Sequence, residues 1–303
     1  MSNPVAQRPK FSVAIQTDTY KNLINNTLQD PKRAQRFIAS ISSAVAVNPD
    51  LQMCDAGTIL SSALLGESLE LSPSPQLGQY YMVPFKDKKN NITKAVFVLG
   101  YKGYIQLAQR SGYYKHINVI ALKKGELTRY DPLNETIEVN MIQDDLKREA
   151  TETIGYYAMF EYLNGFKKIM YWSKEKMANH ANKYSPAFSL YGCTINTKNG
   201  QVKKVSLEDF ERGNYDKSTE WLYSSFWYKD FDGMAYKTIL RQLISKWGIM
   251  SIDLRQAFEA DEAAIGKDGV PQYVDEPDIP ELPAGEPEEY AEDENAEVSM
   301  DDL

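Results

Sequence analysis

Cysteine and histidine are both scarce in this 303-residue chain, which contains two of each. Cys54 and Cys193 lie far apart and have no ligand-like residues beside them, so the sequence predicts neither a disulfide framework nor a zinc site. The first residues contain no apolar signal region, and no apolar run approaches the ~18 residues of a membrane-spanning helix. We therefore expect a cytoplasmic protein in a reducing compartment, with no membrane partner.

Motifs for nucleotide and hydrolytic chemistry are also missing. No glycine-rich loop ends in the Gly-Lys-Ser/Thr sequence that cradles a nucleoside triphosphate, so no ATP requirement is predicted. No Gly-x-Ser-x-Gly elbow supports a catalytic serine, and His116 and His180 have no Cys, Asp or His at metal-ligand spacing. A nuclease would need clustered carboxylates to hold Mg²⁺, and the nearest approach, around Asp87, is better explained as a solvated turn. Hydrolysis therefore has little support.

The charge that is present is divided into two parts of opposite sign. From Glu259 to the last residue, 17 acidic residues accompany a single basic one, Lys267, for a formal charge of −16. Residues 1–258 carry 33 basic and 25 acidic residues, a formal +8 that the overall pI near 5.1 conceals. A basic body of this kind indicates a polyanionic partner, usually nucleic acid.

The composition predicts three segments. Residues 1–29 are expected to form an N-terminal arm and first helix, with 1–16 as a flexible arm. Residues 30–258 are expected to form the main folded domain, which carries the basic charge. Residues 259–303 are expected to be a disordered acidic tail, because proline and acid dominate there. Such a tail either shields the basic surface, recruits partners or only improves solubility.

Within the middle segment, the pattern changes from helical to mainly β and back. Asp30-Pro31 predicts a capped helix that runs to about Val47. A hairpin is expected over Tyr80–Leu99, and a second one at Asn164-Gly165, a pair typical of type I′ turns. A helical region follows over Thr219–Phe258. The expected fold class is α+β.

The first motif with binding character is a glycine-bracketed turn. A strand ending at Leu99 is followed by Gly100-Tyr101-Lys102-Gly103 and then at once by a helix over Tyr104–Arg110. Such a turn lets backbone N–H groups and a helix N-terminus approach a phosphate, with Lys102 adding charge. Gln106, Gln109 and Arg110 share one side of that helix. A tight strand-to-helix turn that merely needs glycine is the alternative explanation.

A polar ridge is predicted on a later helix, between the expected N-cap Asp232 and the expected C-terminal Gly248. Lys237, Arg241 and Ser245 repeat at i, i+4 and i+8, with Thr238, Gln242 and Lys246 beside them, whereas Ala235, Ile239, Leu240, Leu243 and Trp247 form the expected buried stripe. Like charges at i, i+4 cost a helix roughly 0.2–0.5 kcal/mol unless an anion lies across them. A solvated surface and a phosphate contact both fit, and the basic body favours the phosphate.

Basic residues and tyrosines also alternate over Tyr113–Tyr130. Lys115, Lys123 and Arg129 are placed to line a groove with tyrosines between them, because alternate residues of a strand share one face. Half-buried positions in a sheet are the alternative role for these tyrosines.

Three of these segments, taken together in order and spacing, resemble a known family. The run Tyr81–Phe85, the run Gly100–Gly112, and Met234–Thr238 with Arg241 are similar to the RecT family of phage and prophage single-strand annealing proteins, and most closely to members from Gram-positive prophages such as those of Listeria. The resemblance implies a small curved antiparallel sheet packed with helices, distantly similar to Rad52-type annealing proteins. It also implies ATP-independent binding and annealing of single-stranded DNA, in homo-oligomeric rings or helical filaments. Residues 30–258 would then be the DNA-binding and annealing domain, and residues 1–29 would serve subunit contacts.

The resemblance, with the charge pattern, gives the candidate DNA-binding residues. The family motifs imply Lys102, Tyr104, Gln106, Gln109, Arg110, Lys237, Thr238 and Arg241; the charge pattern adds Lys115, Lys123, Arg129, Gln242 and Lys246. Expected partners are single-stranded DNA, the annealed duplex, and a phage exonuclease or host single-strand binding protein at the C-terminal region. No cofactor is expected, and Mg²⁺ only as a counterion of DNA.

Three other functions stay open. A passive coating protein would protect single strands without accelerating annealing. A metal-dependent nuclease would shorten DNA, and a scaffold protein would bind DNA only as its net charge predicts.

Overall fold

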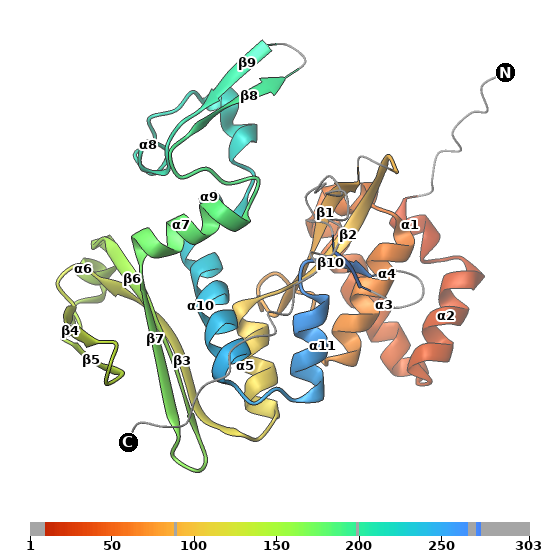
Figure 1. Ribbon diagram of the computed structural model, residues 1–303. Coiled ribbons are helices and arrows are strands. Elements are labelled where there is room, and N and C mark those ends of the chain that lie inside the picture. The colour runs from red at the N-terminus through yellow and green to blue at the C-terminus, as the bar shows by residue number, and fades with distance from the viewer. Residues whose placement is uncertain (1–9, 88–89, 198–199, 266–270, 274–303) are drawn as a thin grey trace, which may run out of the picture.

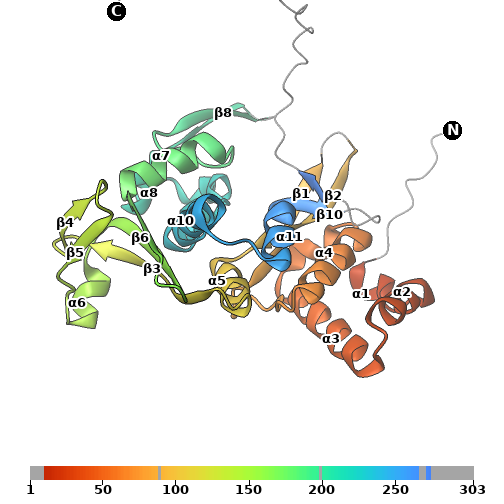
Figure 2. The same cartoon turned by 60° about the horizontal axis from the view of Figure 1, so that its bottom comes forward.

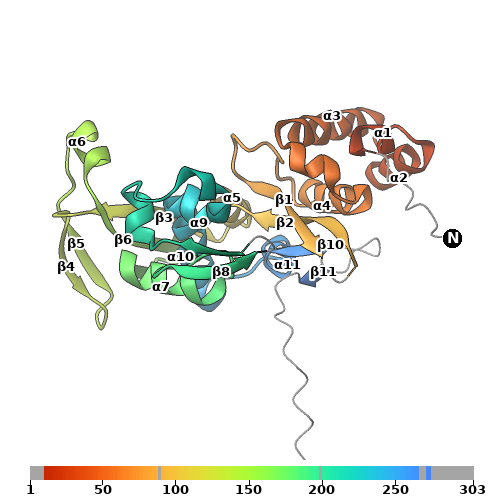
Figure 3. The ribbon, with the colours of Figure 1, turned by 90° about the horizontal axis from the view of Figure 1, so that it is seen from above.

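The computed structural model describes residues 10–87, 90–197, 200–265 and 271–273, and arranges them in two lobes with a hydrophobic core each (Figure 1). Viewed from above, helices of the first lobe lie at one end of an elongated molecule and a two-stranded ribbon of the second lobe lies at the other (Figure 3). The elements of the first lobe are α1 (Phe11–Ala14), α2 (Asp18–Leu28), α3 (Pro31–Val47), the 3-10 helix η1 (Pro49–Met53), α4 (Ala56–Ser68), β1 (Tyr80–Asp87) and β2 (Ile92–Leu99), joined late in the chain by α11 (Ile252–Ala260), β10 (Ala263–Ile265) and β11 (Pro271–Tyr273).

The first lobe is built on local signals that the sequence displays. The Asp30 carboxylate accepts hydrogen bonds from the backbone N–H groups of Lys32 and Arg33, so α3 begins where the cap predicts. Its apolar stripe is buried in the first core, as expected, and the helix contacts α2 and η1. Strands β1 and β2 form the predicted hairpin, with Tyr80 opposite Leu99. Strand β10 then adds antiparallel to β2 and gives the sheet order β1-β2-β10-β11.

The second lobe contains a three-stranded antiparallel sheet in the order β3-β6-β7. Its elements are β3 (Tyr114–Lys123), β4 (Leu127–Asp131), β5 (Thr136–Val139), α6 (Asp145–Ala150), β6 (Thr153–Tyr162), β7 (Lys167–Ser173), α7 (Lys174–Tyr184), β8 (Cys193–Thr197), β9 (Gly200–Lys204), α8 (Leu207–Glu211), η2 (Lys217–Tyr223), α9 (Phe226–Lys229) and α10 (Phe231–Trp247). Helix α10 packs against β6 and β7 and carries much of this core.

The β6–β7 hairpin is confirmed, but its turn differs from the predicted type I′. Only Gly165 has a positive φ, 85°, whereas both central residues of a type I′ turn need one. The Tyr162 N–H donates to the Phe166 carbonyl at 2.8 Å and the Gly165 N–H to the Tyr162 carbonyl at 3.0 Å. This pattern closes a three-residue loop, in which a left-handed glycine follows an ordinary turn.

Helix α5 (Tyr101–Arg110) joins the two lobes. It packs on α11 of the first lobe and on α10 of the second (Figure 2). The ends of α10 differ from the prediction. Asp230, not Asp232, caps it by accepting a hydrogen bond from the Gly233 N–H at 2.9 Å. The Asp232 carboxylate instead accepts a hydrogen bond from the Tyr156 hydroxyl at 2.6 Å. Gly248 has φ −82°, so it is not a left-handed glycine cap.

The structure differs from the predicted segments in two places, the flexible arm and the start of the tail. Phe11 and Ile15, assigned to a flexible arm, are 1% exposed in the first core. The predicted tail begins at Glu259, yet Asp261 is 1% exposed and β10 follows it in the sheet. The acidic composition of the whole tail hid a short structured segment at its start. Residues 266–270 and 274–303, the remainder of that tail, lie outside the described residues, as do 1–9.

The α+β class is confirmed, with helices packed on small antiparallel sheets. The described residues form four sheets in place of one: the four-stranded sheet of the first lobe, and in the second lobe the three-stranded sheet with the two-stranded sheets β4-β5 and β8-β9. Among the described residues, no helix is both long and apolar enough to cross a membrane.

Candidate nucleic-acid interface

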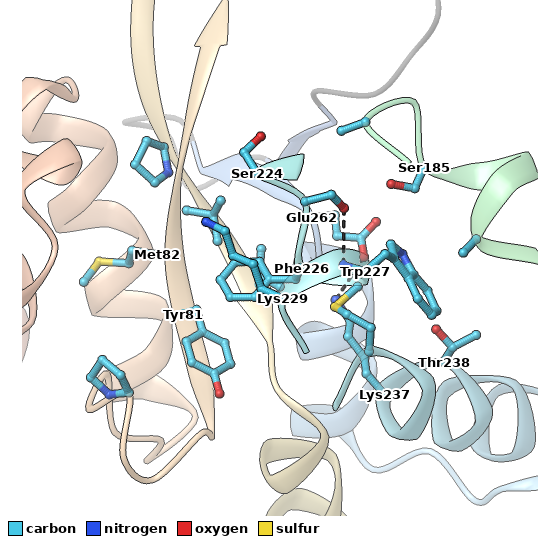
Figure 4. A pocket seen from close by; sticks show the side chains of 18 of the residues that line it. Tyr81, Met82, Ser185, Ser224, Phe226, Trp227, Lys229, Lys237, Thr238 and Glu262 are labelled. Carbon is cyan, nitrogen blue, oxygen red and sulfur yellow. Dashed lines mark hydrogen bonds and ion pairs between the residues drawn. The ribbon is translucent and has the colours of Figure 1, made fainter. Parts of the chain in front are cut away.

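A cleft of about 1020 Å³ separates the two lobes (Figure 4). One wall is the β1–β2 hairpin, which contributes Tyr81, Met82 and Val98. The other wall is formed by the end of α7, by α9 and by one side of α10. The cleft is therefore framed by segments from both halves of the chain.

Aromatic rings from the two walls meet in this cleft. The Tyr81 and Phe226 ring centroids are 6.4 Å apart, although one residue belongs to β1 and the other to α9. Phe226 is 47% exposed, and the exposed Lys229 holds its Nζ 6.0 Å from the Phe226 ring. Exposed rings beside a cation are the parts from which proteins build stacking sites for unpaired bases.

The floor of the cleft is organised by one buried carboxylate, that of Asp261. It accepts hydrogen bonds from the Leu99 backbone N–H at 2.9 Å, the Tyr104 hydroxyl at 2.9 Å, the Lys237 ammonium at 3.0 Å and the Arg241 guanidinium. These donors come from β2, α5 and α10, so a residue just after α11 joins both lobes. The Glu262 carboxylate gives Lys237 a second partner at 2.9 Å. We call Lys237, Arg241, Asp261 and Glu262 the Asp261 cluster.

The Asp261 cluster is electrically balanced, with two cations and two anions. Burial acts to lower the pKa of the Lys237 ammonium, but Asp261 and Glu262 outweigh it and raise that pKa. Burial likewise opposes the charge of Arg241, while Tyr104 and Asp261 raise its pKa. Lys237 in turn lowers the pKa of Glu262. Lys237, Arg241 and Glu262 are therefore ionised at neutral pH.

The structure corrects the predicted exposed ridge on α10. Lys237 and Thr238 are 5% and 9% exposed, whereas Trp247, predicted to be buried, is half exposed. Lys237, Thr238, Arg241 and Gln242 do come together along the cleft, but the anion across Lys237 and Arg241 is the protein's own Asp261. Lys246 is exposed and lies outside the cleft lining.

The glycine-bracketed turn also has a packing explanation. Tyr101 and Lys102 already belong to α5, and a Cβ on Gly100 or Gly103 would lie 2.2 Å from the carbonyl oxygen of Gly78 or Gln79. The glycines therefore let the start of α5 press against another backbone segment, and the Gly100 N–H donates to the Gln79 carbonyl. A free phosphate cradle is not formed at Gly100.

The predicted side chains of α5 have separate environments. Tyr104 is fully buried, so it cannot stack on a base; burial, followed by Asp261, raises the pKa of its hydroxyl. Arg110 pairs with Glu70 at 2.9 Å and donates to the Leu69 carbonyl. Lys102 and Gln109 are exposed, Gln106 is half-buried, and none of these residues lines the cleft.

The predicted basic residues of the β region lie on the second lobe, away from the cleft lining. Lys115 pairs with Glu161, and the Lys123 ammonium donates to the Thr153 hydroxyl at 3.0 Å. The Arg129 side chain is 65% exposed, 4.0 Å from Asp131. The structure thus does not bring these three together with the α10 residues.

Within the described residues, no group of three or more His, Cys, Asp and Glu side chains is placed to hold a metal ion. Comparison with known proteins then identifies the family. The RecT family model matches residues 35–279. The chain belongs to the RecT family. The match continues past Asp261 and β10, so the family region includes the structured segment beyond the predicted domain end.

Two curated relatives agree with membership of the RecT family. The chain is 38% identical over 232 residues to the "Uncharacterized protein YqaK" of Bacillus subtilis, covering 76% of this chain and 66% of that protein. It is 30% identical over 95 residues to "Protein RecT" of Escherichia coli, covering 31% of this chain and 35% of that protein. The alignments thus span just under two thirds and about one third of these relatives.

Several cleft residues of this RecT family chain were not predicted. Tyr81 stood inside a recognised motif but was not singled out. Phe226 and Lys229 begin and end α9, three aromatic residues followed by a lysine, which could have been noticed as a basic–aromatic cluster. Asp261 and Glu262 had no local signal, because they look like the first residues of an acidic tail.

Proposed function

We propose that this protein is an ATP-independent single-stranded DNA-binding and strand-annealing protein of homologous recombination. The observation that carries this proposal is the RecT family match over residues 35–279. Protein RecT of Escherichia coli is among the relatives, and we extend its activity to this chain as part of the proposal.

We place the single strand in the cleft between the lobes. An annealing protein must hold the phosphates while leaving the base edges free to find complements, so backbone contacts with little base readout are required. The cleft offers the exposed Lys229 for a phosphate and Tyr81 with Phe226 for sequence-tolerant stacking. Base pairing itself drives annealing downhill, so neither nucleotide hydrolysis nor a bound metal is needed.

The proposal includes the assembly and its setting. We expect the protein to act as a homo-oligomer, in a ring or helical filament on DNA, in the cytoplasm of a bacterium that carries a phage or prophage. A phage exonuclease that supplies single strands and a host single-strand binding protein are the expected partners of the C-terminal region.

The deciding experiment measures the annealing rate of two complementary oligonucleotides without nucleotide, over a protein titration. Strong acceleration near coating stoichiometry is expected. Tight binding with slowed annealing would instead indicate a passive coating protein, and DNA shortening with Mg²⁺ a nuclease.

The place of DNA is tested by Phe226→Ala with Lys229→Ala. Losing a stacking ring and a phosphate contact is expected to weaken binding at least tenfold, since a ring contributes ~1–3 kcal/mol per base. The matched control is Leu133→Ala with Lys147→Ala, which removes an exposed apolar and an exposed basic residue far from the cleft. Equal effects of the two double variants would overturn the cleft assignment.

A further inference from the structure

Glu262 differs from the rest of the Asp261 cluster in its exposure. Its side chain is 50% exposed and lines the cleft, whereas the Asp261 side chain is fully buried and that of Lys237 is 6% exposed. Figure 4 shows the Glu262 carboxylate reaching across to Lys237. The anion that solvent and ligands can reach in this cluster is therefore Glu262.

The backbone at Glu262 is unusual for a glutamate. Its φ is 67°, in the left-handed region that glycine adopts without penalty and other residues rarely occupy. A glycine here would avoid the strain, so the left-handed backbone is a cost of having a side chain at this position.

The carboxylate can move without disturbing the fold. The Glu262 backbone N–H is fixed by donating to the Phe97 carbonyl at 2.8 Å, which anchors the residue beside β2. If the side chain swings away, Lys237 still keeps Asp261 as a partner at 3.0 Å, so the buried ammonium is never left unpaired. By contrast, Asp261 holds four donors and cannot leave.

Charge balance gives this movement a consequence. With Glu262 in place, the two cations of the cluster are matched by two carboxylates, and the cleft floor offers a phosphate no net attraction. When Glu262 turns toward solvent, Lys237 and Arg241 outweigh Asp261 by one positive charge, which one phosphodiester group can neutralise.

We propose that the Glu262 carboxylate is a displaceable counter-anion of the cleft, which holds Lys237 while the cleft is empty and yields that position to a backbone phosphate of the DNA strand. The inference rests on the proposed function and adds a regulatory feature to the same site. Because Glu262 competes with the phosphate for Lys237, the affinity of the cleft for that phosphate is lowered. A bound strand can therefore shift or leave.

The test compares Glu262→Gln with the control Glu138→Gln, which removes one exposed carboxylate on β5, outside the cleft lining. Binding of a fluorescent oligothymidylate is measured over a salt series, together with the thermal unfolding of each variant. Glu262→Gln is expected to bind on the order of two- to fivefold more tightly than the control, the effect of one solvent-exposed ion pair. Its log–log salt slope should match that of the control, because the same phosphate contacts Lys237 in both proteins once Glu262 has yielded. A slope steeper by about 0.7 would mean that the wild type does not make this phosphate contact, and would reject the displacement.

Stability separates displacement from a structural role. Glu262→Gln should unfold at the same or a lower temperature than the wild type while binding more tightly. If Glu262 only supports the fold, affinity and unfolding temperature will fall together. Glu262→Gly should share the tighter binding but unfold at a higher temperature than Glu262→Gln, because it relieves the left-handed backbone.

The proposed function and the counter-anion would be rejected by different results. A wild type that binds and anneals, with Glu262→Gln matching Glu138→Gln, would reject the counter-anion alone. A wild type that neither binds nor anneals would reject the proposed function and the counter-anion with it.

Discussion

The carboxylates of Asp261 and Glu126 are both buried and paired with a cation, but their partners lie at very different separations along the chain. Glu126 is fully buried and accepts from the Arg148 guanidinium and from the backbone N–H groups of Lys123 and Ile142. All of these partners lie within 22 residues and close the turn between β3 and β4 onto α6. Asp261 draws its Leu99 and Tyr104 partners from 162 and 157 residues away. A paired, buried carboxylate can thus finish a local loop or join two lobes around a cleft.

The comparison also explains why lysines and arginines that look alike in the sequence have different environments in the structure. Lys237 and Arg241 are held at the lobe junction by Asp261, whereas Lys115 and Arg129 remain largely exposed to solvent. Mutating the first pair therefore disturbs the architecture as well as charge, and its effect on DNA binding cannot be interpreted without a stability measurement.

The largest expected effect comes from Asp261→Ala. Removing this carboxylate leaves Lys237 and Arg241 with one buried counter-charge fewer, which costs about 3–5 kcal/mol for broken buried ion pairs. Urea denaturation should show this loss, and DNA binding should fall because both cations lose their anchor. Glu220→Ala, an exposed position, is the control. A loss of unfolding free energy below about 1 kcal/mol would show that Asp261 does not hold the two lobes together.

Glu126→Ala is expected to cost less, about 1–3 kcal/mol, for buried hydrogen-bond donors left unpaired. Arg148 is partly exposed and can turn toward water, which limits the loss. If DNA lies in the cleft, the affinity of this variant for DNA, measured at a temperature where the variant is folded, should equal that of the wild type. Weakened binding would instead favour Lys123 and Arg129, which lie beside Glu126, as the DNA contacts.

The pH dependence of stability should distinguish the two carboxylate sites. Lys237 lowers the pKa of Glu262, and at Glu126 burial is outweighed by Arg148 and backbone N–H groups, so that pKa is lowered too. A lowered folded-state pKa means stabilisation that is complete above the ordinary value of 4.5 and is lost as pH falls through the lowered pKa.

Unfolding free energies measured between neutral and acid pH should therefore converge for the wild type and each of Glu262→Gln and Glu126→Gln at the acid end. The difference at neutral pH is expected to be larger for Glu126→Gln, because its carboxylate is fully buried. Parallel curves that never converge would contradict the lowered pKa values.

The smallest effect is expected from Lys115→Ala with Arg129→Ala. Exposed ion pairs contribute ~0–1 kcal/mol, so stability should hardly change. With the strand in the cleft, the salt slope of DNA binding should also stay the same. A slope reduced by roughly 0.7 per residue would extend the DNA path onto β3 and β4.

Much of the fold was predictable because its signals act over short distances. The Asp30 and Asp55 side chains cap helices by reaching N–H groups two or three residues ahead, and the β1–β2 and β6–β7 hairpins pair neighbouring segments. Alternation and capping residues mark such elements directly.

The candidate site was predicted only in part. Cations of α10 were found from their spacing and from the family motif, and four of the thirteen predicted residues do line the cleft. Exposure could not be read from the pattern, because a lysine at i, i+4 from an arginine looks the same whether it faces solvent or a buried aspartate. Phe226 was missed because an aromatic run is equally typical of a core.

The sequence by itself determined the α+β class, the local elements, the opposite charges of body and tail, and the resemblance to the RecT family. The tertiary structure decided that Tyr104 is buried, that Lys237 and Arg241 hold a carboxylate, and that the supposed first residues of a tail form the floor of the cleft. The physical reason is separation along the chain. A residue's charge is visible in the sequence, but the partner that neutralises it, up to 162 residues away, is chosen only when the lobes pack together.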